Sequence, residues 1–465
     1  MTATGFPDPG ALRAVTVPLD GVPGLDPLAI AGDDGYLFAG PSLTLAGRGA
    51  AAVLPLTGGL DDLAALREAG RWLAAVPSED RVMLPGTGVV AQGALPFGRG
   101  RASSLVLPTL TFGRDETTGR QWAVVVDRVG EAGSAVDASS LRERLARFAS
   151  GGPGGPGGDG GDGGRAGPPP ELAELVAVPG PEDYMAAVAA AVDALADGRL
   201  RKVVLARQLE LRFSAPVRPA GVLRRLHERE PACTAFSHPV DRGRFVGASP
   251  ELLVSRRGRQ VRCHPLAGTV ALVGDAATDR AATEQLLASA KDRVEHRLVV
   301  DEIARALRAA GVGVEGPGEP SIVRLRSVAH LATEVGGSLG DGGTPPGVLE
   351  LLAALHPTPA VGGVPRSDAL AMIEALEASP RGHWAGPVGW ADGSGNGDWM
   401  IGIRSALVDG RTARLWAGAG IVAGSDPAAE LAETVVKFRP VLDALLPGGS
   451  EVLLGTGPPR ESLSQ

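Results

Sequence analysis

Residues 415–437 read LWAGAGIVAGSDPAAELAETVVK, and they say more about the fold than any other part of this chain. The first residues have the composition of a strand, and a glycine-rich turn follows. Ser425, Asp426 and Pro427 then form the signal of a helix start, a capping side chain followed by proline. One face of that helix carries the apolar residues Leu431, Val435, Phe438 and Leu442. The segment therefore predicts a strand, a tight turn and an amphipathic helix in succession.

A second face of the same helix is charged. Glu430, Glu433 and Lys437 are spaced so that they stack on one stripe. Two carboxylates and an ammonium beside exposed backbone amides suit a divalent cation and an anionic ligand, although a solvated helix face has the same pattern. The glycines of the turn do not form a dinucleotide-binding motif, because G-x-G-x-x-G requires a shorter last gap.

Composition excludes several classes of partner. The chain has 465 residues, a formal net charge of -8 and no basic block, which argues against nucleic acid or an acidic membrane surface. Cys233 and Cys263 are its only cysteines, too few for a disulfide framework or a structural zinc site. The start of the chain lacks a signal-peptide pattern, and no apolar run is long enough to span a membrane. We therefore expect a cytoplasmic protein that does not engage a membrane.

Residues 150–170 divide the chain. They consist almost entirely of glycine and proline with a few aspartates, and this composition predicts a flexible linker or loop. We expect an N-terminal α/β part over 1–149, a catalytic region over 171–447 and a C-terminal tail over 448–465. Strand pairs separated by helices favour an α/β (α+β) fold in which two β-sheets form a sandwich flanked by helices.

Several elements are predicted as single pieces. Strands are expected over 36–45, 81–85 and 324–335, and one long helix over 279–310. Residues 399–408 and 412–417 are predicted to form a hairpin around Asp409-Gly410, a strong turn signal. The sequence PLAGT at 265–269 predicts a bend of small residues that lets a ligand approach the backbone.

Four charged residues stand in unusual surroundings. Lys202 begins an apolar strand, where a lysine is either a surface residue or a functional one. Glu251 lies between a turn and a strand, where it either caps backbone or is a desolvated carboxyl with a raised pKa, suited to a general acid. Glu295 borders the apolar face of a helix, so it needs either Lys291 or a cation. Arg404 lies mid-strand and needs an anion.

Together these segments resemble the chorismate-utilising enzymes, and within them the isochorismate synthases. The resemblance is dense over about 171–447 and looser before it. It is carried by a set of motifs in the family's order: KVVLAR, GASPELLV, PLAGT, KDRVEH, HLAT, LHPTPAVGG, RGHWAGPVGW, IRSAL and GAGIVAGSDPAAELAETVVK. Trp384 departs from the family pattern, which usually has Tyr or Phe at that position.

The resemblance implies an isomerase, a Mg²⁺-dependent isochorismate synthase. Water adds at C2 of the chorismate ring while the C4 hydroxyl leaves, so one base and one acid act on the ring. Lys202 matches the family's base and must be uncharged to activate water, and Glu251 matches the acid. Glu295 and Glu433 match the Mg²⁺ ligands, with Glu430 acting through water.

The same resemblance implies the substrate contacts. One carboxylate of chorismate is expected to bridge to Mg²⁺, and the other to meet Arg404 and backbone amides near Gly418. The remaining positions expected around the substrate are Gly268, Thr269, His330, Ala360, Gly420 and Lys437.

Other family members remain alternatives. Anthranilate synthases carry Gln in place of Lys202 and depend on an amidotransferase partner, and aminodeoxychorismate synthases carry Lys in place of Ala267. Both comparisons favour water as nucleophile. We also expect no amidotransferase subunit, and a monomer. Salicylate synthases share the lysine and also eliminate pyruvate, so they stay open, as does a non-catalytic chorismate-binding protein. Menaquinone, siderophore and salicylate routes all begin from isochorismate, and the resemblance does not distinguish them.

Overall fold

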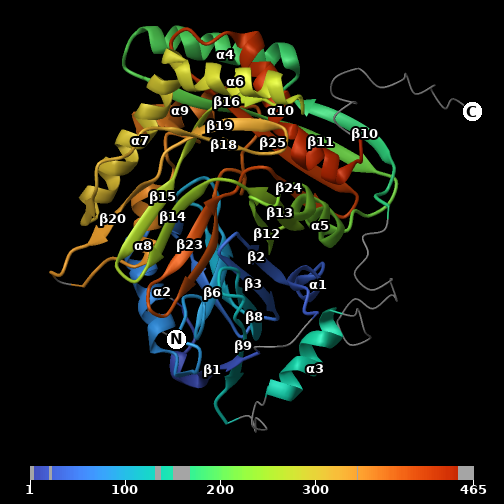
Figure 1. Cartoon of the computed structure of the whole chain (residues 1–465), viewed down its shortest axis with the longest axis vertical. Helices are drawn as coiled ribbons and strands as arrows, with labels where there is room; N and C mark the ends of the chain where they lie inside the picture. Colours follow the sequence, from blue (N-terminus) through green and yellow to red (C-terminus); the bar gives the residue numbers. More distant parts are fainter. Residues whose placement is uncertain (1–4, 20–23, 131–137, 150–167, 343, 449–465) are drawn as a thin grey trace, which may run out of the picture.

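The computed structural model describes residues 5–19, 24–130, 138–149, 168–342 and 344–448. The predicted linker over 150–170 lies outside these residues up to position 167, and the predicted tail lies outside them from position 449. Strands of the described part form three sheets of 13, nine and three strands. The parts of the chain before and after the linker share the two larger sheets, as Figure 1 shows from the mixture of blue and orange strands.

The larger sheet is antiparallel except at its last pair, β1 with β5. Its strands, in spatial order, are β10 (Leu172–Val178), β11 (Lys202–Phe213), β25 (Thr412–Ile421), β24 (Ser405–Asp409), β13 (Arg244–Ser249), β12 (Thr234–Pro239), β2 (Tyr36–Ala39), β3 (Leu43–Arg48), β8 (Leu110–Asp115), β9 (Gln121–Arg128), β1 (Leu12–Pro18) and β5 (Ser78–Asp80), with β21 (Gly363–Val364) against β11.

The nine-stranded sheet packs against it, and the small sheet packs on the helices Ala276–Ala288 and Ala290–Ala309. The nine-stranded sheet runs β17 (Val312–Val314), β20 (Val335–Leu339), β15 (Gln260–His264), β14 (Leu252–Arg257), β23 (Gly397–Ile401), β22 (Pro387–Asp392), β6 (Val90–Ala94), β7 (Ser103–Leu107) and β4 (Ala52–Leu56). The small sheet runs β16 (Leu266–Ala271), β19 (Val328–Ala332) and β18 (Ser321–Arg324).

Helices cover the outer faces of the sheets. They are α1 (Pro27–Ala31), α2 (Leu63–Ala75), α3 (Ala138–Ala149), α4 (Pro181–Ala196), α5 (Pro219–Arg229), α6 (Ala276–Ala288), α7 (Ala290–Ala309), α8 (Val348–Leu355), α9 (Arg366–Leu376) and α10 (Pro427–Leu445). Short 3₁₀ helices span Pro9–Ala11 and Gly59–Asp61. The helices α10, α4 and α5 pack over the larger sheet, and α2, α7 and α8 over the nine-stranded one.

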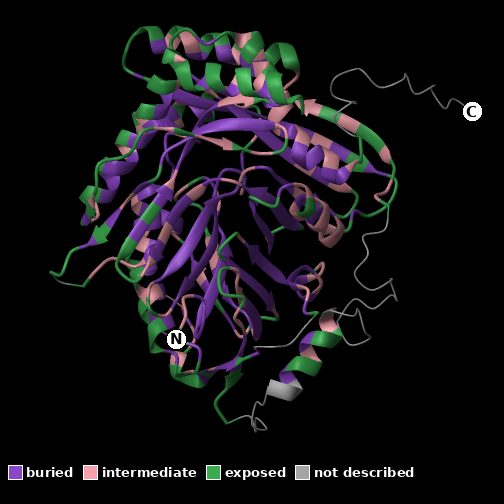
Figure 2. Ribbon diagram, in the orientation of Figure 1, coloured by how far each residue is buried: buried purple, intermediate pink, exposed green. Residues whose placement is uncertain are grey.

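The main core lies between the two large sheets. One buried cluster contains Phe236 and Phe245 of the 13-stranded sheet together with Trp390 and Trp399 of the nine-stranded sheet. A second cluster lies under α5 and α10, where Leu415 meets the helix residues that follow. Figure 2 shows the result as buried strands inside and exposed residues on the helices and loops. The predicted α/β sandwich of two sheets flanked by helices is confirmed, and the small third sheet is an addition to it.

The segment 415–437 folds as predicted. The β25 strand runs to Ile421, and the Asp426 side chain caps α10 by accepting a hydrogen bond of 2.8 Å from the amide of Ala429. The turn at Asp409-Gly410 also forms, and Gly410 has a φ of 56°, a conformation that glycine adopts without steric cost.

Some single elements were predicted wrongly. Residues 36–45 form two strands, β2 and β3, because a turn follows Ala39. Residues 81–85 are not a strand, since the Asp80 carboxylate accepts hydrogen bonds from the amides of Val82 and Met83 and turns the chain. The bend predicted at 265–269 is largely the strand β16, with a register shift at Gly268.

Two longer predictions were also wrong. The long helix over 279–310 is broken into α6 and α7, because the Ser289 side chain accepts a hydrogen bond from the amide of Asp292 and caps a new helix. The strand over 324–335 is likewise divided among β18, β19 and β20, which lie in two different sheets.

The segment 399–408 also divides, and this division forms part of the site. β23 ends at Ile401 in the nine-stranded sheet, and β24 begins at Ser405 in the larger sheet. Arg404 therefore lies at a crossing between sheets and not within a strand, and its φ of 51° is unusual for a residue other than glycine.

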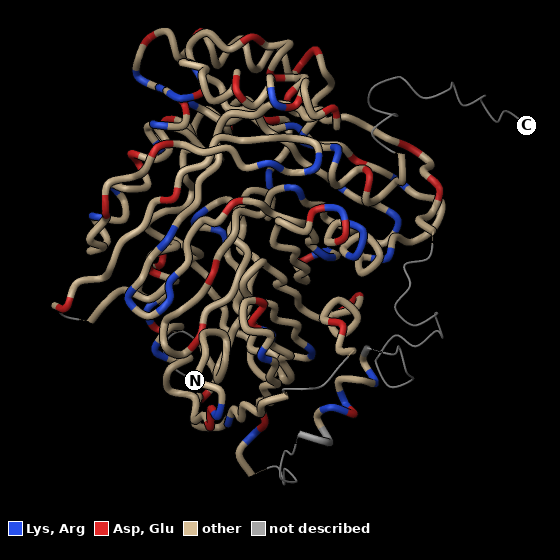
Figure 3. The backbone as a smooth tube through the Cα atoms, viewed as in Figure 1, with Lys and Arg blue, Asp and Glu red and all other residues tan. Residues whose placement is uncertain are grey.

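In the described part of the chain, the helices are all too short or too polar to cross a bilayer. Figure 3 shows that the positions of basic and acidic residues are interspersed along the backbone.

Candidate functional site

A small cavity lies where strands leave one sheet for another. Its volume is about 70 Å³, and its wall contains nearly all of the side chains predicted from the sequence. Those that line it are Lys202, Glu251, Gly268, Thr269, Glu295, His330, Ala360, Arg404, Gly418, Gly420, Glu433 and Lys437. Glu430 does not line it. Residues of β11, β16, β19, β25, α7 and α10, separated by more than 200 positions in the chain, thus meet at one place.

Lys202 is a buried lysine at the first position of β11. Its side chain is 1% exposed, and its Nζ lies 2.9 Å from Oε1 of Glu295, which projects from α7. Gly420, opposite on β25, makes room for this pair, because a Cβ atom there would lie 2.4 Å from the Glu295 carboxylate and 3.0 Å from Cε of Lys202. The interpretation of Lys202 as a surface residue is therefore wrong, and Glu295 is paired with Lys202 instead of Lys291.

Glu251 lies on a second crossing between the large sheets, where β13 ends and β14 has yet to begin. Its carbonyl accepts a hydrogen bond of 3.0 Å from the amide of Ile401. The carbonyl of Arg404 accepts one of 3.1 Å from the amide of Ala248, so backbone hydrogen bonds connect the two crossing segments. Burial raises the pKa of Glu251 to about 7, against the opposing effects of Lys202 and a hydrogen bond from the amide of Leu266. Near neutral pH a large share of this carboxyl is therefore protonated.

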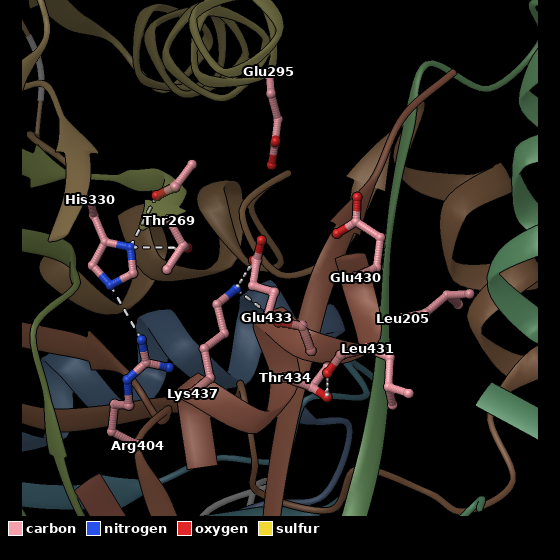
Figure 4. A network of polar contacts seen from close by, with 12 residues as sticks. Leu205, Thr269, Glu295, His330, Arg404, Glu430, Leu431, Glu433, Thr434 and Lys437 are labelled. Atoms are coloured by element: carbon pink, nitrogen blue, oxygen red, sulfur yellow. Dashed lines mark hydrogen bonds and ion pairs between the residues drawn. The ribbon is translucent and has the colours of Figure 1, made fainter. Parts of the chain in front are cut away.

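The charged stripe of α10 reaches the cavity with two of its three members. Glu433 and Lys437 form an ion pair of 2.6 Å, and Nζ of Lys437 also donates to the carbonyl of Gly418 at 2.9 Å. Gly418 has little space for a side chain, because a Cβ atom would lie 3.1 Å from the indole of Trp384. These contacts fasten the helix to β25 and leave the Glu433 carboxylate directed toward that of Glu295 (Figure 4).

Glu430, the third member, has a different environment. It lies in the first turn of α10, and its carboxylate is 3.3 Å from Nζ of Lys291. Burial is the first cause that raises its pKa, followed by repulsion from Glu433, and Glu295 adds to the effect. Three carboxylates therefore share one region, although one of them lies behind the cavity wall.

His330 and Arg404 form a hydrogen-bonded pair on the far side of the cavity. A guanidinium only donates, so Nε2 of His330 accepts from NH2 of Arg404 at 3.2 Å, and Nδ1 carries the proton. Nδ1 donates to the carbonyl of Gly268 at 3.0 Å and lies 3.2 Å from the Thr269 hydroxyl. Burial and the charge of Arg404 lower the pKa of His330 to about 3, so the ring stays neutral and orients the arginine.

Arg404 retains a free donor. Its Nε is buried and has no hydrogen-bond partner among the described residues, and Arg404 is one of the residues that line the cavity. A buried donor of this kind is costly unless a ligand satisfies it. The geometry therefore suits an anionic oxygen in the cavity, the partner that the sequence required for this arginine.

Several cavity residues were missed from the sequence. They are Val204, Leu266, Ala267, Val361, Trp384, Ile403, Trp416 and Ala417. All of them except Trp416 and Ala417 belong to the motifs that carry the family resemblance, so those motifs contained a usable signal. Trp416 follows from strand alternation, since it shares a face of β25 with Gly418 and Gly420.

The carboxylates fit a hard divalent cation bound in part by water and ligand. Glu295 and Glu433 face one another across the cavity, and Glu430 adds negative potential. Among the described residues, no three His, Cys, Asp or Glu side chains form a closed metal site. Mg²⁺ commonly takes one or two carboxylates and completes its shell with water and substrate oxygens, so the donor set suits it.

Two further cavities lie elsewhere in the described part of the chain. One of about 940 Å³ lies among α2, α7 and α9 and shares no residue with the site. Another, of about 320 Å³, adjoins the site behind Trp384 and Trp416. Neither contains the predicted acid, base or carboxylate cluster.

Comparison with known proteins agrees with this geometry. The model of the family described as chorismate binding enzyme matches residues 166–446. Isochorismate synthase DhbC of Bacillus subtilis is 43% identical over 277 residues, which cover 58% of this chain and 69% of that protein. Isochorismate synthase EntC of Escherichia coli is 37% identical over 273 residues, or 58% of this chain and 69% of EntC.

A solved structure extends the similarity over nearly the whole chain. The menaquinone-specific isochorismate synthase MenF of Escherichia coli superposes with a TM-score of 0.74 at 26% identity, covering 95% of this chain and 96% of MenF. The N-terminal part, which the family model does not reach, is included in this coverage. This chain belongs to the family of chorismate-binding enzymes.

Proposed function

We propose that this chain is an isochorismate synthase, an isomerase that converts chorismate to isochorismate with Mg²⁺ as cofactor. The observation that carries the proposal is one cavity containing a buried lysine, a carboxyl with a raised pKa and an arginine with an unsatisfied donor. These are the base, the acid and the anion-binding group that the reaction requires.

Lys202 acts as the base. An oxygen of water bonds to C2 of the ring while the water proton passes to Nζ, which requires the uncharged amine. The side chain is 1% exposed, and its Nζ forms an ion pair with Glu295. A cation held by Glu295 would weaken that ion pair and leave the amine without its counterion.

Glu251 acts as the acid. As the ring double bonds shift, the bond between C4 and its hydroxyl breaks, and the Glu251 proton passes to the leaving oxygen to form water. A large share of a carboxyl with a pKa of about 7 is still protonated at neutral pH, where an ordinary glutamate has lost its proton. One water is consumed and one released, so the reaction is an isomerisation and runs in both directions.

The remaining residues hold the substrate. Arg404, oriented by His330, binds one carboxylate through the unsatisfied Nε–H, and Gly418 and Gly420 line the cavity in which the ring binds. Glu295 and Glu433 would hold Mg²⁺, which when bound supplies positive charge for the second carboxylate. Water needs no delivery from another subunit, so a single chain without an amidotransferase suffices.

Product analysis tests the proposal. The purified chain is incubated with chorismate and Mg²⁺, the products are separated by chromatography, and the Glu251→Gln variant serves as the matched control. Isochorismate is expected, with approach to the same equilibrium from either side. Stoichiometric pyruvate would assign a salicylate synthase instead, and anthranilate formed from ammonium salts would refute water as the nucleophile.

A further inference from the structure

The strand that carries Lys202 has an incomplete edge. β25 pairs with β11 along almost its whole length on one side. On the other side β21 pairs only with Lys202 and Val203, and β10 pairs from Gln208 onward. The amide of Val204 still donates to the carbonyl of Gly362 at 2.8 Å, but no strand among the described residues pairs with positions 204–207 on this side. Backbone groups of a buried strand need hydrogen-bond partners, so something else must supply them.

Glu377 and Arg381 fill this gap with side chains. The Glu377 carboxylate accepts from the amide of Ala206 at 2.9 Å, and NH2 of Arg381 donates to the carbonyl of Val204 at 2.8 Å. The two side chains form a 2.5 Å ion pair and are 7% and 2% exposed. Together they present one acceptor and one donor to the edge, as a neighbouring strand would.

Arg381 also binds two other walls of the cavity. Its NH1 donates to the carbonyl of Val361 at 2.6 Å, in the loop that contains Ala360. Its own carbonyl accepts from the amide of Trp384 at 3.0 Å, and its guanidinium lies 5.1 Å from that ring. Val204, Val361 and Trp384 all line the cavity, whereas Arg381 and Glu377 do not.

The energetics favour a positional role over a purely stabilising one. A buried ion pair must overcome the desolvation of both charges, and well-packed apolar residues are often at least as stable. A guanidinium is planar and has five N–H donors in a fixed arrangement, so it can hold several acceptors at defined distances. An apolar pair cannot do this. Here those acceptors are the backbone of the lysine strand and the backbone of the opposite wall.

We propose that Arg381 and Glu377 are positioning residues for the isomerisation. They hold the start of β11, and with it the Lys202 amine, at a fixed distance from the wall formed by Ala360, Val361 and Trp384. The inference rests on the proposed function, since it requires Lys202 to act on a ring held against that wall. Displacement of a reacting group by 1 Å can cost about 10²-fold in rate.

Two variants separate positioning from stability. Arg381→Met leaves the Glu377 charge buried alone, so we expect both a lower melting temperature and a lower kcat. The double variant Glu377→Gln/Arg381→Met contains no buried charge and keeps an acceptor for the amide of Ala206. Its melting temperature is expected to return toward that of the wild type, whereas kcat stays low because the Val361 carbonyl still lacks its donor.

The measurement that distinguishes the two roles is the separate effect of the substitutions on kcat and on KM. In the double variant we expect kcat to fall by about tenfold to ~10²-fold while KM changes by less than about threefold. Hydrogen exchange should also rise at positions 203–206, because the edge of β11 has lost a donor. Arg244→Met is the matched control: this buried arginine of the same sheet donates to Gly35 and Ser237 and lines no part of the cavity, so it should lose stability and keep kcat.

Recovery of kcat together with the melting temperature in the double variant would overturn the proposal, because the pair would then be structural only. Unchanged exchange at 203–206 would overturn it independently of activity. A wild-type chain that makes no isochorismate refutes the proposed function instead, and the exchange experiment then decides alone whether the pair holds β11.

Discussion

Replacing Glu251 with glutamine is expected to inactivate the enzyme and to stabilise it at the same time. The amide has the shape of the protonated carboxyl but has no acidic proton to give to the leaving hydroxyl. Loss of one general acid typically costs on the order of 10²–10⁴ in rate. Since the same acid serves both directions of a reversible isomerisation, both rates should fall together.

The stability change follows from the raised pKa. In the unfolded chain the carboxyl titrates near 4.5 and in the folded chain near 7. Between these values the folded state binds more protons, so stability falls as pH rises and the loss is complete above the folded value. With one pKa unit worth 1.36 kcal/mol, wild type is penalised by about 3 kcal/mol near pH 8 and about 1 kcal/mol near pH 5.

Glutamine removes this penalty because it cannot ionise. Denaturant unfolding of wild type and Glu251→Gln, with chelator present so that no cation binds, should show the variant ahead by about 3 kcal/mol near pH 8 and by much less near pH 5. Glu210→Gln is a control of opposite sign, because hydrogen bonds from Arg414 and Arg212 lower the pKa of Glu210. A Glu251→Gln variant that is less stable than wild type near pH 8 would refute the assignment of Glu251 as a buried, protonated acid.

The remaining predictions concern the base, the carboxylates and the linker. Lys202→Gln should lower kcat by on the order of 10²–10⁴ while chorismate still binds, and a variant that keeps more than about a tenth of wild-type turnover would remove the lysine from the mechanism. Glu295→Gln and Glu433→Gln should each abolish Mg²⁺-dependent turnover without unfolding the chain, and near-normal rates at low millimolar Mg²⁺ would refute these ligands. Glu430→Gln should cost less, since this side chain lies outside the cavity wall. Deleting residues 151–167 should leave melting temperature and activity almost unchanged, because loop length affects closure entropy only weakly, and a large loss of either would show that the segment packs on the enzyme.

Motif order predicted which residues meet, because family motifs report side chains that share one cavity however far apart they lie. The sequence could not show how the backbone brings them there. Glu251 and Arg404 each lie where the chain passes from one sheet to the other, and a strand pattern such as 399–408 continues through the crossing without interruption. The positive φ of Arg404 is imposed by tertiary contacts and leaves no trace in local propensity.

Hydrophobic periodicity also could not predict where a side chain caps a new helix. Ser289 is tolerated inside a helix as well as at its start, so periodicity alone joined α6 to α7. The pair Glu377 and Arg381 has the spacing of an ordinary surface pair on a helix. Their role becomes visible only because β11 lacks a strand partner beside them, where their side chains bond its backbone. Sheet pairing depends on residues far apart in the chain, so local sequence cannot predict it.

The net charge of the chain and the charges that line the cavity give different indications about the ligand. A net charge of -8 gives no indication of an anionic substrate, because charges farther apart than about 10 Å are screened from one another by salt. The cavity has its own balance: Lys202, Arg404 and Lys437 oppose Glu251, Glu295 and Glu433. A large share of Glu251 is protonated near neutral pH and does not repel an anion, and Arg404 has an unsatisfied donor for the carboxylate that must bind. An acidic protein can therefore bind an anion, since a few buried groups, and not the sum over the surface, set the potential inside a small cavity.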